Sequence, residues 1–145
     1  MRLVVDANIL YSVLLKTDGA VADVFFNLRP LPELCAPKYL RHELQRHRSR
    51  IAKLMGKTVA EVSIALELLL SRVVLIDPSI ILDEAWSAAH VLVAQVDPND
   101  EDYVALSIHL NCPLWTGDLK LARALKAGPV TVLSTAEVRD LFARQ

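Results

Sequence analysis

The stretch RLVVDANIL, residues 2–10, decides the fold class. Leu3 to Val5 is a short, mostly β-branched run of the kind that forms a strand buried on both faces. The chain from Ile9 to Lys16 then has the apolar spacing of a helix. Asp6 is therefore predicted at the carboxyl end of a strand, which is the edge where open α/β sheets bind their ligands.

Strand-like and helix-like segments alternate along the rest of the chain, with no repeat and no linker. This alternation predicts an α/β fold, a three-layer α/β/α sandwich around a mostly parallel sheet of about four to five strands. The length of 145 residues predicts one domain, 1–145. Thr58 with Glu61 forms a capping-box pattern, and Ser134 is a possible N-cap. Further strands are predicted at 34–36, 73–76, 112–115 and 130–133, and further helices at 19–28, from 37 onward, and at 58–70, 80–96, 101–110, 119–127 and 135–143.

The composition is that of an ordered chain without a global preference for nucleic acid. A hydrophobic content of 53% with 23% charged residues excludes a disordered chain, and a net charge of -1 gives no overall attraction to phosphate. The segment from Lys38 to Lys57 is locally basic, however, with Glu43 as its only acid. It is equally typical of a solvated helix face and of a phosphate-binding face. The candidates for nucleic-acid contact are Arg41, Arg46, Arg48, Arg50 and Lys53.

Two cysteines and four histidines have no spacing that indicates a disulfide framework or a closed metal site. The apolar run before Asp6 is too short for a signal peptide, and no apolar run approaches the roughly 20 residues of a membrane span. These features predict a cytoplasmic protein that does not associate with membranes.

Acidic residues stand at the ends of apolar runs or at the starts of helices. Taken singly, each is as readily a turn or N-cap residue, and an acid on the basic segment could simply pair with Arg46 or His47. Gathered by the fold, they would repel one another unless a hard divalent cation such as Mg²⁺ or Mn²⁺ resolved the conflict. The pattern predicts metal-dependent nuclease chemistry at Asp6, Glu43, Asp100 and Asp118.

The order of these motifs resembles the PIN-domain ribonucleases, including the VapC-type toxins of bacterial and archaeal toxin-antitoxin pairs. LVVDANILYSVLL (3–15) looks like the family's first motif, a hydrophobic strand that runs into Asp-x-Asn. APKYLRHEL (36–44) looks like the second, with an acid on a helix. DEDYVALSIHLNCPLWTGD (100–118) resembles the third and fourth motifs together, ending in Thr-x-Asp. The resemblance covers nearly the whole chain.

The resemblance implies an endoribonuclease that hydrolyses RNA phosphodiester bonds with a water activated by Mg²⁺ or Mn²⁺. Asp6, Asp100 and Asp118 would bind metal, and Glu43 would bind or orient a second ion or the attacking water. Asn8 and Thr116 would hydrogen-bond the carboxylates. Within this sequence, Asn8 is also a possible cap of the first helix, and Thr116 a possible partner of a backbone group at a turn. The basic segment would contact phosphates of single-stranded or looped RNA.

Three acids compete for the third position of the family pattern. Asp100 is preferred because it places hydrophobic and small residues at the family's positions and leaves the usual interval to Asp118. Asp97 is the reserve candidate, since a DPxD turn could bring a second carboxylate near the metal. Asp102 is expected to face away from Asp100 on the helix.

Several functions remain open at this stage. A phosphoacceptor signalling domain has a similar length and alternation, but it expects paired acids after the first strand and a late Lys, which this chain lacks. An RNA-processing PIN nuclease and a non-catalytic scaffold that binds RNA or protein are the alternatives to a toxin. The resemblance also implies an antitoxin partner and a homodimer or higher homo-oligomer. Apolar residues of the first two helices are predicted either as core or as a partner surface: Tyr11, Leu14, Val21, Phe25 and Phe26.

Overall fold

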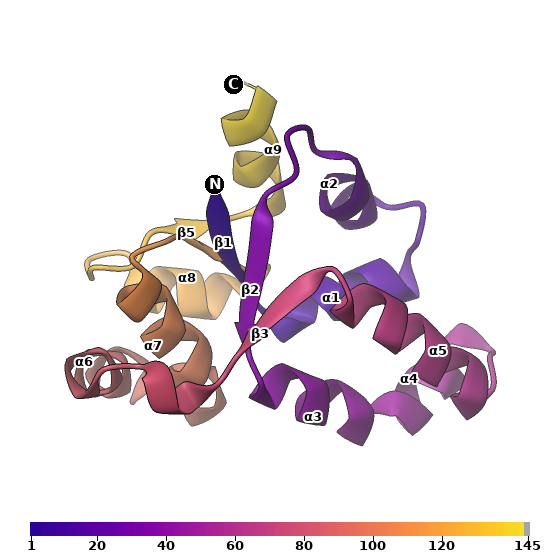
Figure 1. Ribbon diagram of the computed structural model, residues 1–145, viewed down its shortest axis with the longest axis horizontal. Helices are drawn as coiled ribbons and strands as arrows, with labels where there is room; N and C mark the ends of the chain where they lie inside the picture. Colours follow the sequence, from indigo (N-terminus) through magenta and orange to yellow (C-terminus); the bar gives the residue numbers. More distant parts are fainter. Residues whose placement is uncertain (144–145) are drawn as a thin grey trace.

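The computed structural model describes residues 1–143, and its centre is a parallel sheet of five strands (Figure 1). The strand order is β3-β2-β1-β4-β5, and every neighbouring pair is parallel. The first strand along the chain therefore lies in the middle of the sheet. The predicted mostly parallel α/β sheet is confirmed. The strands are β1 (Arg2–Val5), β2 (Glu33–Pro37), β3 (Val73–Ile76), β4 (Leu114–Trp115) and β5 (Val132–Leu133).

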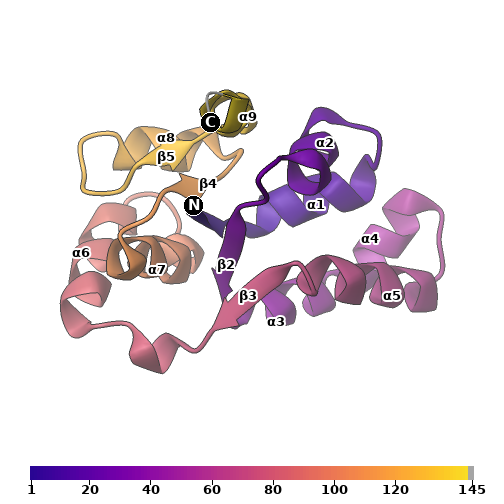
Figure 2. The ribbon, with the colours of Figure 1, turned by 45° about the horizontal axis from the view of Figure 1, so that its top comes forward.

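Helices cover both faces of this sheet, as Figure 2 shows. One layer contains α6 (Asp83–Val93), α7 (Glu101–Leu110) and α8 (Leu119–Leu125), in which α7 packs against β1, β2 and β4. The other contains α1 (Ala7–Leu15), α2 (Ala20–Asn27) and α9 (Thr135–Ala143). Three more helices, α3 (Tyr39–Arg46), α4 (Arg48–Met55) and α5 (Val59–Leu70), form an arm beside α1. Short 3₁₀ turns lie at Pro78–Ile80 (η1) and Pro98–Asp100 (η2).

Several predicted element boundaries were wrong. Pro37 does not begin a helix but ends β2, because the next residue, Lys38, donates its backbone N–H to Ile76 of β3 and so prolongs the extended chain. The helix predicted from residue 80 begins at Asp83, after the 3₁₀ turn that the Asp77 side chain caps through the Ser79 N–H. The basic segment is divided at His47 into α3 and α4, instead of continuing as one helix.

Both helix caps singled out in the sequence are present. Thr58 accepts a hydrogen bond from the Glu61 N–H, and Glu61 accepts one from the Thr58 N–H, which completes the capping box of α5. Ser134 and Glu137 exchange the same pair of bonds at the start of α9. Such caps satisfy backbone donors that a helix end leaves free.

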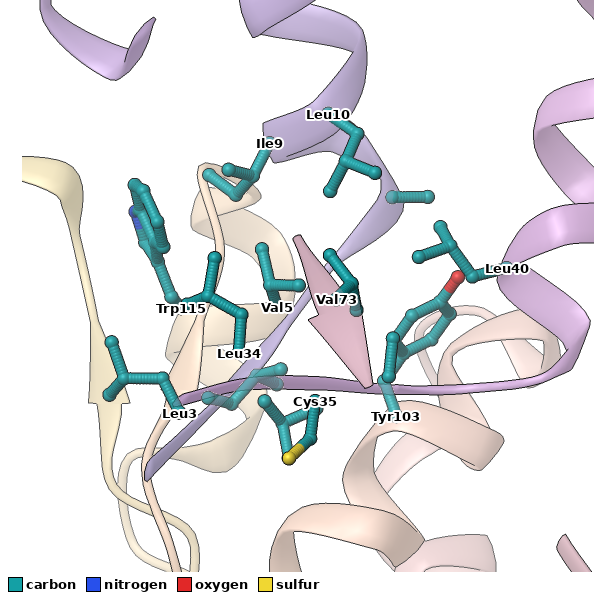
Figure 3. Packing of buried hydrophobic residues seen from close by; sticks show 14 of the residues in the cluster. Leu3, Val5, Ile9, Leu10, Leu34, Cys35, Leu40, Val73, Tyr103 and Trp115 are labelled. Carbon is teal, nitrogen blue, oxygen red and sulfur yellow. The ribbon is translucent and has the colours of Figure 1, made fainter. Parts of the chain in front are cut away.

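The core lies on both faces of the sheet, and Trp115, Tyr103 and Phe25 are its largest fully buried side chains. Figure 3 shows the Trp115 and Tyr103 side chains among their apolar neighbours. The apolar residues of the first two helices divide between core and surface. Leu14 and Phe25 are buried, whereas Phe26 is 42% exposed. Among the described helices, none is both long and apolar enough to cross a membrane.

Candidate active site

The sheet brings two acidic positions together at the carboxyl ends of β1 and β4. These strands are neighbours, with Val5 paired to Trp115. The ladder continues one residue further, because the Asp6 N–H donates to the Trp115 carbonyl at 3.0 Å. Asp6 and the Thr116-Gly117-Asp118 turn therefore meet at the same edge of the sheet, although more than 100 residues separate them in the chain.

The Thr116 hydroxyl is the centre of a small polar network at this edge. It donates to Asp6 Oδ2 at 2.7 Å and accepts hydrogen bonds from Asn8 Nδ2 at 3.2 Å and from the Asp118 N–H at 3.1 Å. Asn8 Oδ1 also accepts the Gly117 N–H at 3.2 Å. Thr116 thus hydrogen-bonds a carboxylate as the resemblance implied, whereas Asn8 bonds Thr116 and Gly117 and so links the first motif to the fourth instead of capping α1.

Asp118 caps α8. Its Oδ1 accepts hydrogen bonds from the backbone N–H groups of Lys120 and Leu121, at 3.0 and 3.1 Å. Asp118 therefore has the N-capping role that an acidic residue before a helix commonly has. Both bonds use Oδ1, so capping the helix leaves Oδ2 for a ligand.

Glu43 is held in place by two tyrosines from other helices. The Tyr103 hydroxyl of α7 donates to Glu43 Oε2, and the Tyr11 hydroxyl of α1 donates to the Glu43 carbonyl, each at 3.4 Å. Tyr103 was not recognised in the sequence, where it was assigned only to a hydrophobic position. It follows Asp100 by three residues, a spacing that places two side chains on one helix face, and this signal could have identified it.

Asp100 is the centre of the acidic cluster. Its Oδ2 is the one buried side-chain nitrogen or oxygen within residues 1–143 that has no hydrogen-bond partner. Burial, and after it the charges of nearby carboxylates, together raise the pKa of Asp100 to about 7. Those carboxylates belong to Asp6, Asp97, Asp118 and Glu43.

The same crowding affects two other members of the cluster. Burial raises the pKa of Asp6, although the hydrogen bond from Thr116 opposes this effect. Burial also raises the pKa of Glu43, the Asp6 carboxylate adds to the rise, and the Tyr103 hydrogen bond opposes it. The four acids singled out in the sequence therefore form one electrostatically coupled group.

The other two candidates for the third acid lie differently. Asp97 is exposed, and its Oδ1 accepts the Asn99 N–H at 2.9 Å, which caps η2. It still lies near enough to raise the pKa of Asp100 and of Glu43. Burial and the neighbouring Glu101 raise the pKa of Asp102, and none of the cluster acids contributes. Asp100 is thus inside the cluster, Asp97 at its border and Asp102 outside it.

A family model described as "PIN domain" matches residues 4–138. The chain belongs to the PIN-domain family. Among solved structures, this PIN domain is similar to a chain in the crystal structure of VapBC2 from Rickettsia felis bound to a DNA fragment from their promoter. The TM-score is 0.74 and the identity is 19%, and the alignment covers 92% of this chain and 98% of the other. No curated protein matches the sequence significantly.

The donor set of this PIN domain fits a hydrated hard cation. Within the part of the chain that the structure describes, no three His, Cys, Asp or Glu side chains form a ready metal cage. Mg²⁺ does not need one, because it keeps several waters and binds through one or two carboxylates. The unpartnered Asp100 oxygen and the mutual repulsion of the cluster supply the buried oxygen ligand and the negative charge that such an ion requires.

Among the basic residues of this PIN domain, Arg46 of α3 acts directly on the acidic cluster, because its charge opposes the rise in the pKa of Glu43. Arg41 forms an ion pair with Glu67 of α5 and is therefore less available for contact with a phosphate than the sequence suggested. Arg48, Arg50 and Lys53 lie exposed on α4. Burial and then Glu43 raise the pKa of Tyr11 to about 12, while Arg46 and Arg50 oppose this rise, so both guanidinium groups lie near the Tyr11 hydroxyl.

Proposed function

We propose that this PIN domain is a metal-dependent ribonuclease that hydrolyses RNA phosphodiester bonds. The observation that carries the proposal is the buried, unpartnered Asp100 Oδ2 among four further carboxylates. A stable protein does not usually keep such an arrangement without a counter-ion, because each unpaired buried charge costs free energy.

In this proposal, Mg²⁺ or Mn²⁺ is held by Asp6, Asp100 and Asp118, with Glu43 and the reserve candidate Asp97 beside them. When bound, such an ion lowers the pKa of a water and neutralises charge on the phosphate oxygens. Thr116 and Asn8 keep the Asp6 carboxylate and the Asp118 turn in register.

Glu43 is proposed to orient the attacking water and to accept its proton. A carboxylate suits this role better when its pKa lies above the ordinary range, because a general base works best near the operating pH. Burial and the Asp6 charge raise the pKa of Glu43 in that direction. The Tyr103 hydroxyl hydrogen-bonds Glu43 Oε2, which leaves Oε1 to bind the attacking water.

Single-stranded or looped RNA is the proposed substrate. Exposed cations on α4 and at the end of α3 border the acidic cluster, so a phosphate chain lying along these helices would reach it. Contacts of this kind position the backbone and give the binding its salt dependence.

We further propose that the protein is the toxin of a toxin-antitoxin pair, with an antitoxin partner and self-association. The support is the resemblance to VapC-type toxins and the similarity to a chain of the VapBC2 structure. An RNA-processing nuclease and a non-catalytic scaffold are the alternatives, and the filled acidic positions argue against a scaffold.

Cleavage of a mixed single-stranded RNA tests the nuclease directly. Wild-type protein is compared with Asp100→Asn, and with Asp140→Asn as an exposed control from α9, in Mg²⁺, in Mn²⁺ and in chelator. Metal-dependent cutting by the wild type and by Asp140→Asn, but not by Asp100→Asn, is expected. Equal cutting by all three proteins, or cutting in chelator, would contradict the proposal. Single-stranded DNA in a parallel reaction separates a ribonuclease from a general nuclease.

A further inference from the structure

A cavity of about 270 Å³ lies between α1, α3 and α4 and opens beside the acidic cluster. Glu43 belongs to both, because it lines the cavity and is coupled electrostatically to Asp6 and Asp100. A molecule bound at the cluster would therefore have a neighbouring part of itself at the mouth of this cavity. The function proposed above does not use the cavity.

The walls of the cavity are aromatic and aliphatic. The rings of Tyr11 and His47 meet edge to face, with centroids 6.1 Å apart and planes at 68°. Ile51, Leu15 and Leu54 are the aliphatic residues of the lining, and Leu15 and Leu54 are 48% and 65% exposed, so they present apolar surface to a bound ligand. An exposed apolar hollow of this kind is typical of a ligand site.

Positive charge as well as the acid Glu43 borders the cavity. Arg50 lines the cavity itself, and Arg46 and Arg50 both lie close enough to Tyr11 to act on its hydroxyl. A ligand with a flat, weakly polar part beside an anionic part would match this arrangement. A nucleotide has both parts, because the base stacks on an aromatic face and the phosphate meets guanidinium groups.

We propose that this cavity is a nucleobase pocket, which holds the base next to the phosphodiester at the acidic cluster. Tyr11 is the stacking face, Leu15 and Leu54 pack on the rest of the base, and Arg50 contacts the adjoining phosphate. The proposal rests on the ribonuclease function and adds a specificity-determining contact to it. A protein helix is a less suitable occupant, since it would need a long apolar groove, whereas this hollow is bounded by a cation and an acid.

Binding in chelator, where no cleavage is expected, tests the pocket. The probes are dye-labelled oligoadenylate and oligouridylate of about eight nucleotides, a length within the range of single-strand binding sites, and an abasic ribose-phosphate chain of the same length and charge. Fluorescence anisotropy gives the affinities of the wild type, Tyr11→Leu, Tyr11→Phe and Leu54→Ser. Leu68→Ser is the matched control, because Leu68 is 67% exposed on α5 and does not line this cavity.

The wild type should bind the base-bearing probes more tightly than the abasic chain. Tyr11→Leu should lose about 5- to 150-fold in affinity for the base-bearing probes, the range of one stacked base, with the abasic affinity unchanged. Tyr11→Phe and Leu68→Ser should bind as the wild type does, and Leu54→Ser should show a smaller, base-dependent loss.

Three results would overturn the pocket: no RNA binding, equal wild-type affinity for all probes, or an equal loss on all probes in Tyr11→Leu. Unchanged RNA binding in Tyr11→Leu and Leu54→Ser, together with lost self-association, would show instead that the cavity is a protein interface. A separate cleavage assay in Mg²⁺ distinguishes the two proposals. Base-dependent binding without cleavage would support the nucleobase pocket and contradict the ribonuclease function. Cleavage with base-independent binding would support the ribonuclease function and contradict the pocket.

Discussion

The Thr116 hydroxyl lies 2.7 Å from the Asp6 carboxylate and donates a hydrogen bond to it, in a place where both side chains are buried. The bond joins the ends of two neighbouring strands and opposes the rise in the pKa of Asp6 that burial causes. It therefore connects the architecture of the sheet to the electrostatics of the acidic cluster.

Thr116→Val should destabilise the protein by about 1–3 kcal/mol, because the isosteric side chain leaves a buried carboxylate without its donor. The pKa of Asp6 should rise further for the same reason. Urea unfolding measures the loss of stability, with Thr131→Val as an exposed control. A loss no larger in Thr116→Val than in the control would show that the hydrogen bond is not important for stability.

Asp100→Asn should stabilise the metal-free protein at pH 8 and leave it unchanged near pH 4. The pKa of Asp100 is raised to about 7 in the folded protein, so between pH 4 and 7 the folded state binds more protons than the unfolded state. The free energy of unfolding contributed by this group therefore falls as the pH rises through that window. Asn at this position carries no charge, so the loss of stability caused by ionising Asp100, on the order of 1 kcal/mol for a partly exposed carboxyl group, does not occur in the variant.

Urea unfolding in chelator at the two pH values checks this expectation, with Asp140→Asn as control. Added Mg²⁺ should stabilise the wild type and not Asp100→Asn, since only a protein that binds the ion gains stability from it. A stabilisation that does not depend on pH would rule out titration of Asp100 as its cause.

Asp118→Asn should separate capping from catalysis. Asn is as good an N-cap as Asp, so the free energy of unfolding should stay within about 0.5 kcal/mol of the wild type. Cleavage should fall at least about 100-fold, because a charged ligand of the ion is lost. Asp118→Ala should lose cleavage and also about 1 kcal/mol of stability.

Asp77→Asn is the matched control for this pair, because Asp77 also caps a helical turn but lies outside the acidic cluster. It should cleave as the wild type does. Full cleavage by Asp118→Asn would remove Asp118 from the proposed metal site.

Tyr103→Phe should shift the acid limb of the pH-activity profile to higher pH. Burial raises the pKa of Glu43 and the Tyr103 hydrogen bond opposes that rise, so without the hydroxyl the pKa of Glu43 should rise further. Glu43 would then lose its proton only at higher pH, with a loss of about three- to tenfold in rate on the acid limb of the profile. Tyr39→Phe, a half-buried tyrosine on α3, should leave the profile unchanged. A uniform loss of rate without a shift would point to a purely structural effect.

Arg48→Gln should lower the slope of log affinity against log salt concentration by about 0.7, the value for one phosphate contact on single-stranded RNA. Arg41→Gln should change it less, because Arg41 is already paired with Glu67. Titrations with a short RNA in chelator at several salt concentrations give both slopes. Equal changes in the two variants would show that the ion pair opens when RNA binds.

Features that depend on a few adjacent residues were predicted well from the sequence. The strand-helix alternation, the capping box at Thr58, the N-cap at Ser134 and the helix beginning at Glu101 are all present as expected. Each follows from side-chain periodicity or from bonds within one helical turn, which are local properties of the chain. The break of the basic segment at His47 was not predicted. It allows Ile51 and Ala52 of α4 to pack in the core, and such packing depends on residues distant in the sequence.

The sequence by itself determined the α/β class, the positions of Asp6, Asp100 and Asp118 at the starts of helices, and the position of Glu43 within a helix, since these depend on local patterns. Only the tertiary structure decided that β1 lies between β2 and β4, which brings Asp6 beside Thr116. It also decided that Tyr103 bonds Glu43 and that several carboxylates lie close enough to Asp100 to raise its pKa. Strand order, burial and the approach of charges distant in the chain depend on how layers pack, and no spacing along the chain expresses them.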